Sequence, residues 1–333
     1  MRLTKVDPEA PQRELLKEAA ELLRSGQLVA FPTETVYGLG AHALDEAAVR
    51  LIYEAKGRPS VNPLIVHVAS PKAARELALE WTAAANALAM AFWPGPLTLV
   101  VRKRGIIPDL VTAGGDTVGL RVPSHPVALA LLEEAGVPVA APSANLSTQV
   151  SPTTADHVVR GLGERGGVAL VVDGGPTSVG IESTVVDVTG AVPRVLRPGM
   201  ISHESIKSVA GAVEIATQVE PGESAKSPGM MGRHYAPRAR VRLFNRDEMD
   251  AVLRDARDAA RQGERVGAMV FVSLGVEGIH EHIMVPNPAG YARLLYATFH
   301  EMDDARCDLV LVERPPAGAE WDAIRDRLER ATR

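Results

Sequence analysis

The sequence has almost no cysteine: Cys307 is the single example in 333 residues. One cysteine cannot form an intrachain disulfide, and it supplies no set of thiolate ligands for a zinc ion. This scarcity fits a reducing compartment, so we expect a cytoplasmic protein.

Long hydrophobic runs are missing as well. Nowhere do 18 uncharged apolar residues stand together, and the N-terminal segment has charges scattered through it without a continuous apolar stretch. We therefore expect neither a membrane span nor a signal peptide.

Charge of one sign is not in large excess. The formal net charge is -5 and the isoelectric point is near 6.0. Such a chain has no overall electrostatic attraction to nucleic acid, although a local basic groove is compatible with this balance. Small-molecule chemistry is the class of function that the charge favours.

The best-known nucleotide and zinc signatures are absent too. The sequence contains no G-x-x-x-x-G-K-[ST] loop, no H-E-x-x-H and no paired cysteines. One G-x-G-x-x-G stretch, residues 161–166, follows a helical pattern and precedes a strand, which is the reverse of the dinucleotide-binding order. We interpret it as a loop.

The chain is long enough for two domains, because single hydrophobic cores stop growing near ~250 to 300 residues. In the first 200 residues, helical patterns alternate with short apolar runs, which predicts a mixed α/β domain. Strands are expected at residues 28–31, 63–68, 97–101, 117–122, 137–141, 168–172 and 184–188. Helices are expected at residues 13–24, 45–55, 83–91, 125–135 and 154–160, with Asp45 and Thr153 as N-caps.

The periodicity fails around residues 212–238, where Pro and Gly are frequent, and this marks a linker. After it, strands at 241–244, 266–272 and 308–313 alternate with helices at 246–262 and 289–302, which predicts a small parallel sheet. A last amphipathic helix is expected at 319–333.

Phe31-Pro-Thr-Glu-Thr-Val-Tyr-Gly-Leu-Gly40 runs from the end of a buried strand into polar residues. Hydroxyls and a carboxylate at a strand end suit a ligand pocket, but an ordinary solvated loop would read the same way. Taken alone, this segment leaves both interpretations open.

Lys56-Gly-Arg58 lies at the end of a predicted helix. The two cations would either cap that helix or hold an anion such as a triphosphate, with Asn62 adding a neutral hydrogen bond. Gly57 would let the backbone pass close to such a ligand.

Two more segments place polar groups beside predicted strands. Ser143 and Asn145 follow the strand at 137–141, at the carboxyl end where open α/β sheets bind ligands. Arg121 lies within an apolar strand, where a charge is costly unless it is paired. A buried salt bridge and a carboxylate-binding role are equally compatible with Arg121.

Taken in order, seven motifs resemble the YrdC-type threonylcarbamoyl-AMP synthases: P-T-E-T-V-Y-G-L-G, K-G-R-P-x-x-N-P-L, W-P-G-P-L-T, R-V-P, P-S-A-N, S-T-V-V-D and L-R-P-G. The segment from Ser227 to Pro237, S-P-G-M-x-x-x-H-Y-A-P, resembles the linker of the longer members. This resemblance implies a YrdC-like domain with a twisted mixed sheet at 1–207, a linker closing over the active site at 208–239, and a smaller Rossmann-like parallel α/β domain at 240–333.

The resemblance also implies the reaction. Members of this family condense L-threonine, bicarbonate and ATP into threonylcarbamoyl-AMP and pyrophosphate, with Mg²⁺ accompanying the ATP. A separate transferase complex then uses the product to modify adenosine 37 of tRNA. Direct contact with RNA is not required, although weak RNA binding is compatible with the family.

Site residues are carried over from the family motif by motif. Lys56 and Arg58 are the expected catalytic residues, where they would neutralise the phosphates. The expected ATP contacts are Lys56, Arg58, Asn62, Thr117, Ser143, Asn145, Ser151, Arg197 and Tyr235. The expected L-threonine contacts are Thr35, His67, Arg121, Ala141 and Ser183. The metal ligands are not identified by these motifs.

Two alternatives come from other classes of function. An RNA-binding regulator would use a concave basic surface, and its RNA affinity would fall steeply with salt. A carbamoyl transferase of hydrogenase maturation contains a related domain, but this chain lacks the zinc-finger cysteines and the acylphosphatase segment of those proteins.

Overall fold

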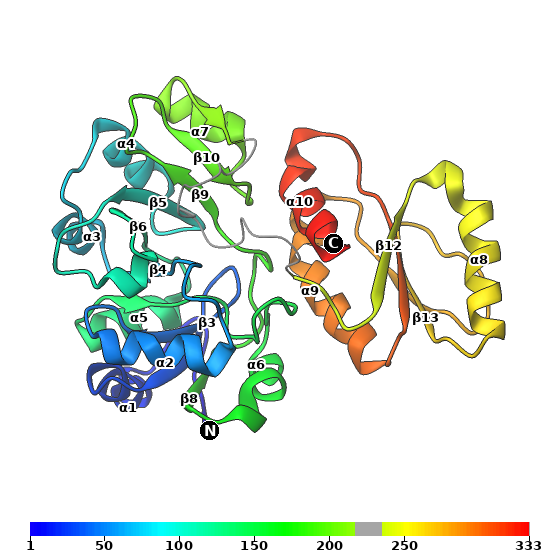
Figure 1. The fold of residues 1–333 in the computed structure, drawn as a ribbon, viewed down its shortest axis with the longest axis horizontal. Helices are drawn as coiled ribbons and strands as arrows, with labels where there is room; N and C mark the ends of the chain where they lie inside the picture. The colour runs from blue at the N-terminus through cyan, green and yellow to red at the C-terminus, as the bar shows by residue number, and fades with distance from the viewer. Residues whose placement is uncertain (217–234, 333) are drawn as a thin grey trace. The chain divides into compact units, whose positions relative to one another are not determined.

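A computed structural model of the chain describes residues 1–216 and 235–332. These residues form two compact units, and Figure 1 labels helices and strands of both. The first unit contains residues 1–147 and 151–216, and the second contains residues 148–150 and 235–332. No helix among the described residues is long and apolar enough to cross a membrane.

The first unit is built on a mixed sheet of 11 strands in the order β1-β8-β2-β3-β7-β4-β6-β5-β9-β10-β11. The strands are β1 (Arg2–Lys5), β2 (Leu28–Pro32), β3 (Tyr37–His42), β4 (Ile65–His67), β5 (Leu97–Arg102), β6 (Thr117–Arg121), β7 (Val139–Ala140), β8 (Val168–Asp173), β9 (Thr184–Asp187), β10 (Arg194–Arg197) and β11 (Glu214–Ile215). Parallel pairs such as β4 with β6 stand beside antiparallel pairs such as β5 with β6, so the expected mixed sheet is confirmed.

Seven α-helices and two short 3-10 helices accompany this sheet in the part of the first unit that the structure describes. They are α1 (Arg13–Arg24), α2 (Glu46–Lys56), α3 (Pro71–Leu77), α4 (Ala83–Phe92), η1 (Asp109–Thr112), α5 (Pro126–Ala135), α6 (Ala155–Leu162), η2 (Gly163–Arg165) and α7 (His203–Ala210). The predicted helices at 13–24 and 83–91 match α1 and α4 to within one residue. Asp45 caps α2, as expected, by accepting from the backbone N–H groups of Ala47 and Ala48.

The two faces of this sheet bury different sets of side chains. On one face, α1 and α5 pack against apolar residues of β8, β2 and β7, such as Leu170, Val29 and Val139. On the other face, α2, α4, α6 and α7 contribute to a larger core that takes Val66, Leu99 and Leu120 from β4, β5 and β6. The alternation of side chains along a strand produces this division.

Three expectations need correction. Thr154, not Thr153, caps α6, and it accepts from the N–H of His157. The segment that follows Pro32 does not stay a loop: it returns as β3, antiparallel to β2. Residues 208–216 are the end of α7 and the edge strand β11, which pairs with β10, so they are not yet linker. Residues 217–234 of the predicted linker lie outside the described residues.

The second unit has a parallel sheet of four strands in the order β12-β15-β13-β14, which confirms the predicted parallel α/β domain. Its elements are β12 (Arg240–Phe244), η3 (Arg246–Glu248), α8 (Met249–Arg261), β13 (Val266–Val270), β14 (His280–Ile283), α9 (Pro288–Asp304), β15 (Leu309–Glu313), η4 (Ala319–Trp321) and α10 (Asp322–Ala331). Helix α8 lies on one side of the sheet, and α9 and α10 lie on the other (Figure 1).

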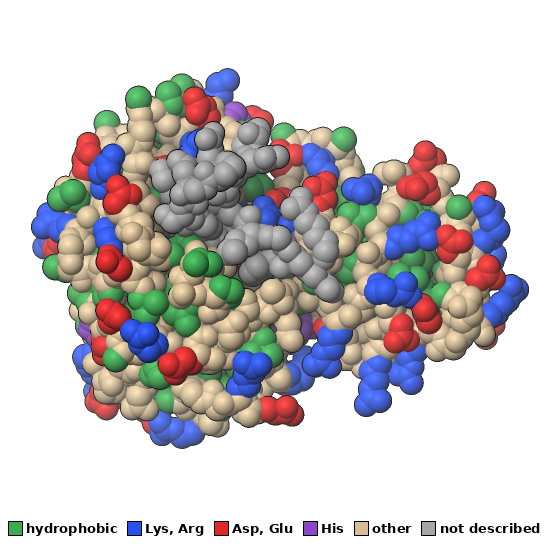
Figure 2. Space-filling view, viewed as in Figure 1, with side chains coloured by type: hydrophobic (Ala, Val, Ile, Leu, Met, Phe, Trp, Pro, Cys, Tyr) green, Lys and Arg blue, Asp and Glu red, His purple; other side chains and the backbone are tan. Residues whose placement is uncertain are grey.

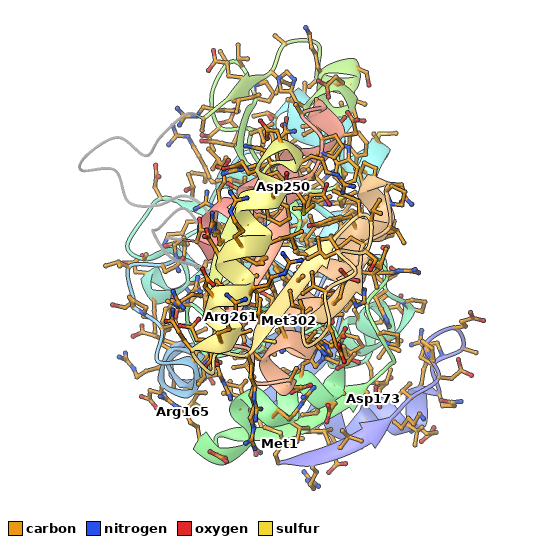
Figure 3. The ribbon with its side chains drawn as sticks, turned by 90° about the vertical axis from the view of Figure 1, so that its right-hand side faces the viewer. Met1, Arg165, Asp173, Asp250, Arg261 and Met302 are labelled. Atoms are coloured by element: carbon orange, nitrogen blue, oxygen red, sulfur yellow. The ribbon has the colours of Figure 1, made fainter. Side chains whose placement is uncertain are left out.

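Figure 3 marks the two ends of α8 near Asp250 and Arg261. This helix buries Val252 and Ala256 against the strand residues Ala268 and Leu311. The same view shows β1 starting at Met1 and running towards Asp173, the residue that pairs with Lys5 at the end of β8. Each unit therefore has its own sheet and its own core.

Candidate active site

Polar side chains stand at matching positions on neighbouring strands of the first unit. His67 on β4 and Arg121 on β6 are register partners. Gly119 lies two residues before Arg121 on β6, so both point to the same face of the sheet. A Cβ atom on Gly119 would lie 3.1 Å from the Thr98 Cγ2 atom, which places Thr98 of β5 on that face as well. All three polar side chains are buried. The core on the opposite face takes their apolar neighbours along the strands, such as Val66 and Leu120.

The row continues towards the far edge of the sheet. The hydroxyls of Thr98 and Ser183 lie 2.8 Å apart, and Arg197 on β10 donates to the Ser183 carbonyl at 3.1 Å and to its hydroxyl at 3.2 Å. Gly199 permits this packing, since a Cβ there would lie 2.3 Å from the Thr184 backbone nitrogen. We call His67, Arg121, Thr98, Ser183 and Arg197 the polar row.

The polar row occupies the part of the sheet face that α1 and α5 leave uncovered. The apolar cluster beneath these helices takes residues from β2, β7 and β8, and among the described residues it takes none from β4, β5 or β6. Polar groups on a buried sheet face cost free energy unless they find partners. The row is therefore a place where a polar ligand would bond to His67 Nδ1 and Arg121 Nη2, which have no hydrogen-bond partner among the described residues.

The turn at residues 33–36 lies at the end of β2, and its own hydrogen bonds hold it. The Thr33 hydroxyl accepts from the N–H groups of Thr35 and Val36, both at 3.2 Å, and lies 2.8 Å from the Thr35 hydroxyl. From the segment before Ser183, the N–H of Val179 donates to the Glu34 carbonyl at 2.7 Å and that of Gly180 donates to the Thr35 carbonyl at 3.0 Å. These bonds bring Thr35 to the segment that carries Ser183, two of the expected threonine contacts.

Glu34 reaches Arg121 from this turn. Its Oε1 atom lies 2.8 Å from Nη2 of Arg121, and both side chains are 5% exposed. The contact is an ion pair by distance without hydrogen-bond alignment: neither Glu34 carboxylate oxygen, nor the Arg121 Nη2 atom, has a hydrogen-bond partner among the described residues. Arg121 thus takes part in a buried salt bridge and keeps a donor for another group.

His67 lies beside Arg121 and is held as a neutral ring. Burial, and after it the Arg121 charge, lowers the pKa of His67 to about 3. Its Nδ1 atom has no hydrogen-bond partner in the described part of the chain, and the ring meets Phe31 edge-on, with 6.4 Å between centroids. His67 is therefore available as a neutral hydrogen-bonding group next to a cation.

Lys56 and Arg58 form a second, cationic part of the site. Lys56 ends α2, and Gly57 takes the left-handed conformation, with φ of 58°, that closes the helix. The Lys56 ammonium donates to the carbonyl of Ser143 at 2.5 Å and to that of Asn145, in the loop after β7. Arg58 donates to the carbonyls of Asn62 at 3.1 Å and Pro63 at 2.9 Å.

Both cations are buried, and the hydrogen bonds given above go to backbone carbonyl groups. Burial, and after it the neighbouring Arg58 guanidinium, holds the pKa of Lys56 well below its usual range. A bound anion would offset both effects, because it would supply the opposite charge that the carbonyl groups only partly replace. The arrangement fits phosphate binding better than a simple helix cap, since the Lys56 ammonium bonds to another loop.

The remaining expected ATP residues lie around this loop or further along the sheet. Asn145 donates from its side chain to the Leu146 carbonyl at 2.8 Å, and Ser151 donates to Glu182 Oε1 at 2.6 Å. Thr117 begins β6, and its register partner is Arg102 on β5. Ala141 donates its N–H to the Ile65 carbonyl at 2.9 Å, which joins the loop after β7 to β4.

Tyr235 is the one expected site residue that belongs to the second unit. It is buried there, with its ring 5.8 Å from that of Tyr296 and the Arg327 guanidinium 5.1 Å from its centroid. Its backbone φ is 64°, an uncommon value for a residue with a side chain. Its contact with ATP stays a prediction.

The expected site residues did not include two buried carboxylates. Glu34 pairs with Arg121, and Glu182 accepts from Ser151. Glu34 stands inside the motif P-T-E-T-V-Y-G-L-G, and Glu182 directly precedes S-T-V-V-D, so the signal was present in the sequence. What the sequence did not show was the partner, because each pair joins segments that are far apart along the chain.

Two family models match this chain. Residues 21–199 match the Sua5, YciO and YrdC model, described as telomere recombination, and residues 201–332 match the C-terminal domain of threonylcarbamoyl-AMP synthase. The threonylcarbamoyl-AMP synthases of Pyrococcus abyssi and Bacillus subtilis are 42% and 41% identical to it. The alignments cover 95% of this chain in both cases, with 94% and 92% of the relatives.

A solved structure matches the fold over the whole chain. The crystal structure of Pyrococcus abyssi Sua5 complexed with L-threonine has a TM-score of 0.91 and 40% identity, and the match covers 100% of this chain and 98% of that one. The structure of Escherichia coli YciO covers 60% of this chain with a TM-score of 0.52 and 24% identity, so it is informative about the fold alone.

Proposed function

This chain belongs to the Sua5, YciO and YrdC family, and we propose that it is an L-threonylcarbamoyladenylate synthase, a nucleotidyltransferase that condenses L-threonine, bicarbonate and ATP to threonylcarbamoyl-AMP and pyrophosphate. The match to full-length relatives named threonylcarbamoyl-AMP synthase, and to a relative solved with L-threonine, supports the assignment. The product would serve the threonylcarbamoyl modification of tRNA adenosine 37.

One observation carries the proposal: the cationic pair Lys56 and Arg58 and the polar-row residue His67 lie along the same two segments. The first segment runs from Lys56 to His67 and the second from Ala141 to Asn145. They are joined at one end by Lys56 and the Ser143 carbonyl, and at the other by the Ala141 N–H and the Ile65 carbonyl. A triphosphate at one end and an amino acid at the other would thus be neighbours.

The roles of the side chains follow from their chemistry. Lys56 and Arg58 would neutralise the phosphates, and Asn62, Thr117, Ser143, Asn145, Ser151 and Arg197 would complete the ATP site. Arg121 would bind the threonine carboxylate, with Thr35, His67, Ala141 and Ser183 around the rest of the molecule. Because no covalent intermediate is needed when a carbamate oxygen displaces pyrophosphate in line from the α-phosphorus, positioning and charge neutralisation are the tasks of the protein.

Magnesium fits this site as a companion of ATP. Among the described residues, no group of three or more His, Cys, Asp or Glu side chains is arranged to hold a metal ion. Mg²⁺ is commonly held by substrate phosphates and water with one or two carboxylates, so a protein cage is not required. When bound, it would neutralise phosphate charge next to Lys56 and Arg58.

We further propose that the protein acts in the cytoplasm and passes its product to a tRNA threonylcarbamoyl transferase complex. The single cysteine supports the location. Stable RNA binding is not part of the proposal, because Lys and Arg side chains are interspersed with Asp and Glu on the face drawn in Figure 2, and the formal net charge is -5.

The test is pyrophosphate release from ATP, measured with bicarbonate and each amino acid in turn. We expect release that depends on L-threonine and bicarbonate together, and a product with the mass of threonylcarbamoyl-AMP. Leaving out either substrate is the control for simple ATP hydrolysis. Release that is indifferent to threonine, or RNA affinity that falls steeply with salt in a chain that turns over no ATP, would contradict the proposal.

A further inference from the structure

Glu34 is a buried carboxylate whose backbone is fixed and whose side chain is incompletely bonded. The Thr33 turn and the N–H of Val179 hold the backbone on both sides. The side chain is directed at Arg121, yet neither of its oxygens has a hydrogen-bond partner among the residues that the structure describes. A carboxylate in this state accepts hydrogen bonds strongly.

Among the described residues, Glu34 interacts with Arg121 and His125. Arg121 contacts it from β6, and the Glu34 charge acts on His125 at the start of α5: burial, the larger effect, lowers the pKa of His125, while Glu34 raises it. His125 already uses its Nδ1 atom to accept from the N–H of Val127. Arg121 is therefore the principal partner of Glu34. Because the two side chains are not aligned for a hydrogen bond, both can still form hydrogen bonds with another group.

The hydrogen-bonding groups without a described partner are a donor on Arg121 and acceptors on Glu34. Arg121 offers a donor at Nη2, whereas Glu34 offers acceptors at both carboxylate oxygens, and His67 adds its Nδ1 atom beside Arg121. An α-amino acid carries the complementary pair: a carboxylate that accepts and an ammonium that donates. Burying ions without full hydrogen bonding is unfavourable, and such a ligand would satisfy both at once.

We propose that Glu34 recognises the amino group of the substrate amino acid, while Arg121 binds its carboxylate. The two side chains form one site for the zwitterion, and Glu34 favours amino acids by binding the amino group that other acids lack. This inference rests on the proposed function, since it assumes that an amino acid binds at Arg121. Within that function, it assigns Glu34 a role that the carried-over set of threonine contacts leaves open.

The experiment is calorimetric titration of the full chain with L-threonine and with 3-hydroxybutanoate, which keeps the carboxylate and hydroxyl but lacks the amino group. Glu34→Gln should weaken threonine about 100-fold and change 3-hydroxybutanoate by less than about threefold, because only threonine loses its charged acceptor. Glu34→Asp, which keeps the charge on a shorter side chain, should restore part of the threonine affinity.

The control is Asp187→Asn, which neutralises another buried carboxylate of the first unit. Asp187 ends β9, four residues beyond Ser183, and accepts from the N–H of Thr189 at 2.9 Å and from its hydroxyl at 2.6 Å. Threonine affinity should stay unchanged in this variant. Binding of a non-hydrolysable ATP analogue serves as the readout of an intact fold, and it should stay unchanged in Glu34→Gln.

The outcomes separate the two proposals. Threonine affinity that is unaltered in Glu34→Gln, or that falls together with the affinity for 3-hydroxybutanoate and the ATP analogue, overturns the role of Glu34 and leaves the proposed function standing. If the unsubstituted chain binds no threonine and releases no threonine-dependent pyrophosphate, the proposed function fails, and this inference fails with it.

Discussion

The two units of this protein bury polar groups very differently. Among the described residues, 21 of the 24 buried polar or charged side chains other than tyrosine belong to the first unit, and only Thr298, Glu313 and Arg327 belong to the second. The second unit satisfies its buried carboxylate internally, since Glu313 accepts from the Phe271 N–H at 2.9 Å and pairs with Arg246 at 3.0 Å. For this reason we expect the chemistry in the first unit.

The difference also shows what a sheet of each kind can do. All strands of the second sheet are parallel, and its faces are buried under helices, so side chains such as Met269 and Leu311 are apolar on both faces. The first sheet is mixed, and α1 and α5 cover only part of one face. The uncovered part carries the polar row. Substitutions matched between the units test this contrast.

The largest effect is expected for Arg58→Ala. Loss of its buried positive charge should lower threonine-dependent pyrophosphate release by about 10²- to 10³-fold or more, because phosphate charge would go unneutralised in a water-poor site. Initial rates measure the effect, and circular dichroism checks the fold. Arg50→Ala is the matched control, since Arg50 lies on α2, the helix that precedes Arg58, is exposed and pairs with Glu46. Unchanged release in Arg58→Ala would remove Lys56-Gly-Arg58 from the active site.

Arg121→Ala should weaken threonine far more than ATP. Removing one partner of a buried charge pair typically costs about 2 to 5 kcal/mol, and here the loss would fall on the ligand carboxylate. The KM values for the two substrates, determined separately, distinguish a binding role from a structural one. Equal weakening of threonine and ATP would make Arg121 a structural residue.

Two glycines offer a matched test of packing in the two units. Gly199→Ala should destabilise the first unit by about 1 to 3 kcal/mol and disturb activity, because the new Cβ would meet backbone atoms of Thr184 at 2.3 Å. Gly267→Ala should cost less, since its nearest contact is the flexible Met302 side chain at 2.5 Å. Denaturant unfolding gives both values. A larger loss at Gly267 would reverse the expected order.

The smallest effect is expected for two tyrosine hydroxyls. Tyr37 donates to the Gly175 carbonyl at 2.7 Å, so Tyr37→Phe should cost about 1 kcal/mol in the first unit. The buried Tyr291 hydroxyl has no hydrogen-bond partner in the described residues, so Tyr291→Phe should leave the second unit equally or slightly more stable. Thermal unfolding compares them, and a clear loss at Tyr291 would point to an unrecognised partner.

Strands that are buried on both faces were predictable from the sequence. The expected runs at 97–101 and 168–172 correspond to β5 and β8, because a continuous apolar run between turn residues is typical of such strands. Strand β14, with the sequence His-Glu-His-Ile, was missed because it lies at a sheet edge and is polar. Pairing with β13, a long-range interaction, makes it a strand.

The motifs proposed the site as a set of residues, but they could not give its arrangement. The motifs named Lys56, Arg58 and Arg121, and the structure places each of them buried within the first unit. The sequence could not show that Glu34 faces Arg121. The two residues are far apart along the chain, and it is the arrangement of strands in the sheet that brings them together. Pairwise partners of buried charges are a property of topology.

The polar row has a consequence for insertions and deletions. Along β4 and β6, odd-numbered positions face the site and even-numbered positions face the apolar core. Deleting one residue within β6 ahead of Arg121 would move that side chain into the core and bring Leu120 or Val122 to the site. Whether a residue of these strands faces the site or the core thus depends on its position being odd or even. Substitutions preserve this alternation, whereas insertion or deletion of a single residue inverts it. Homologues should therefore confine length changes to the loops between these strands.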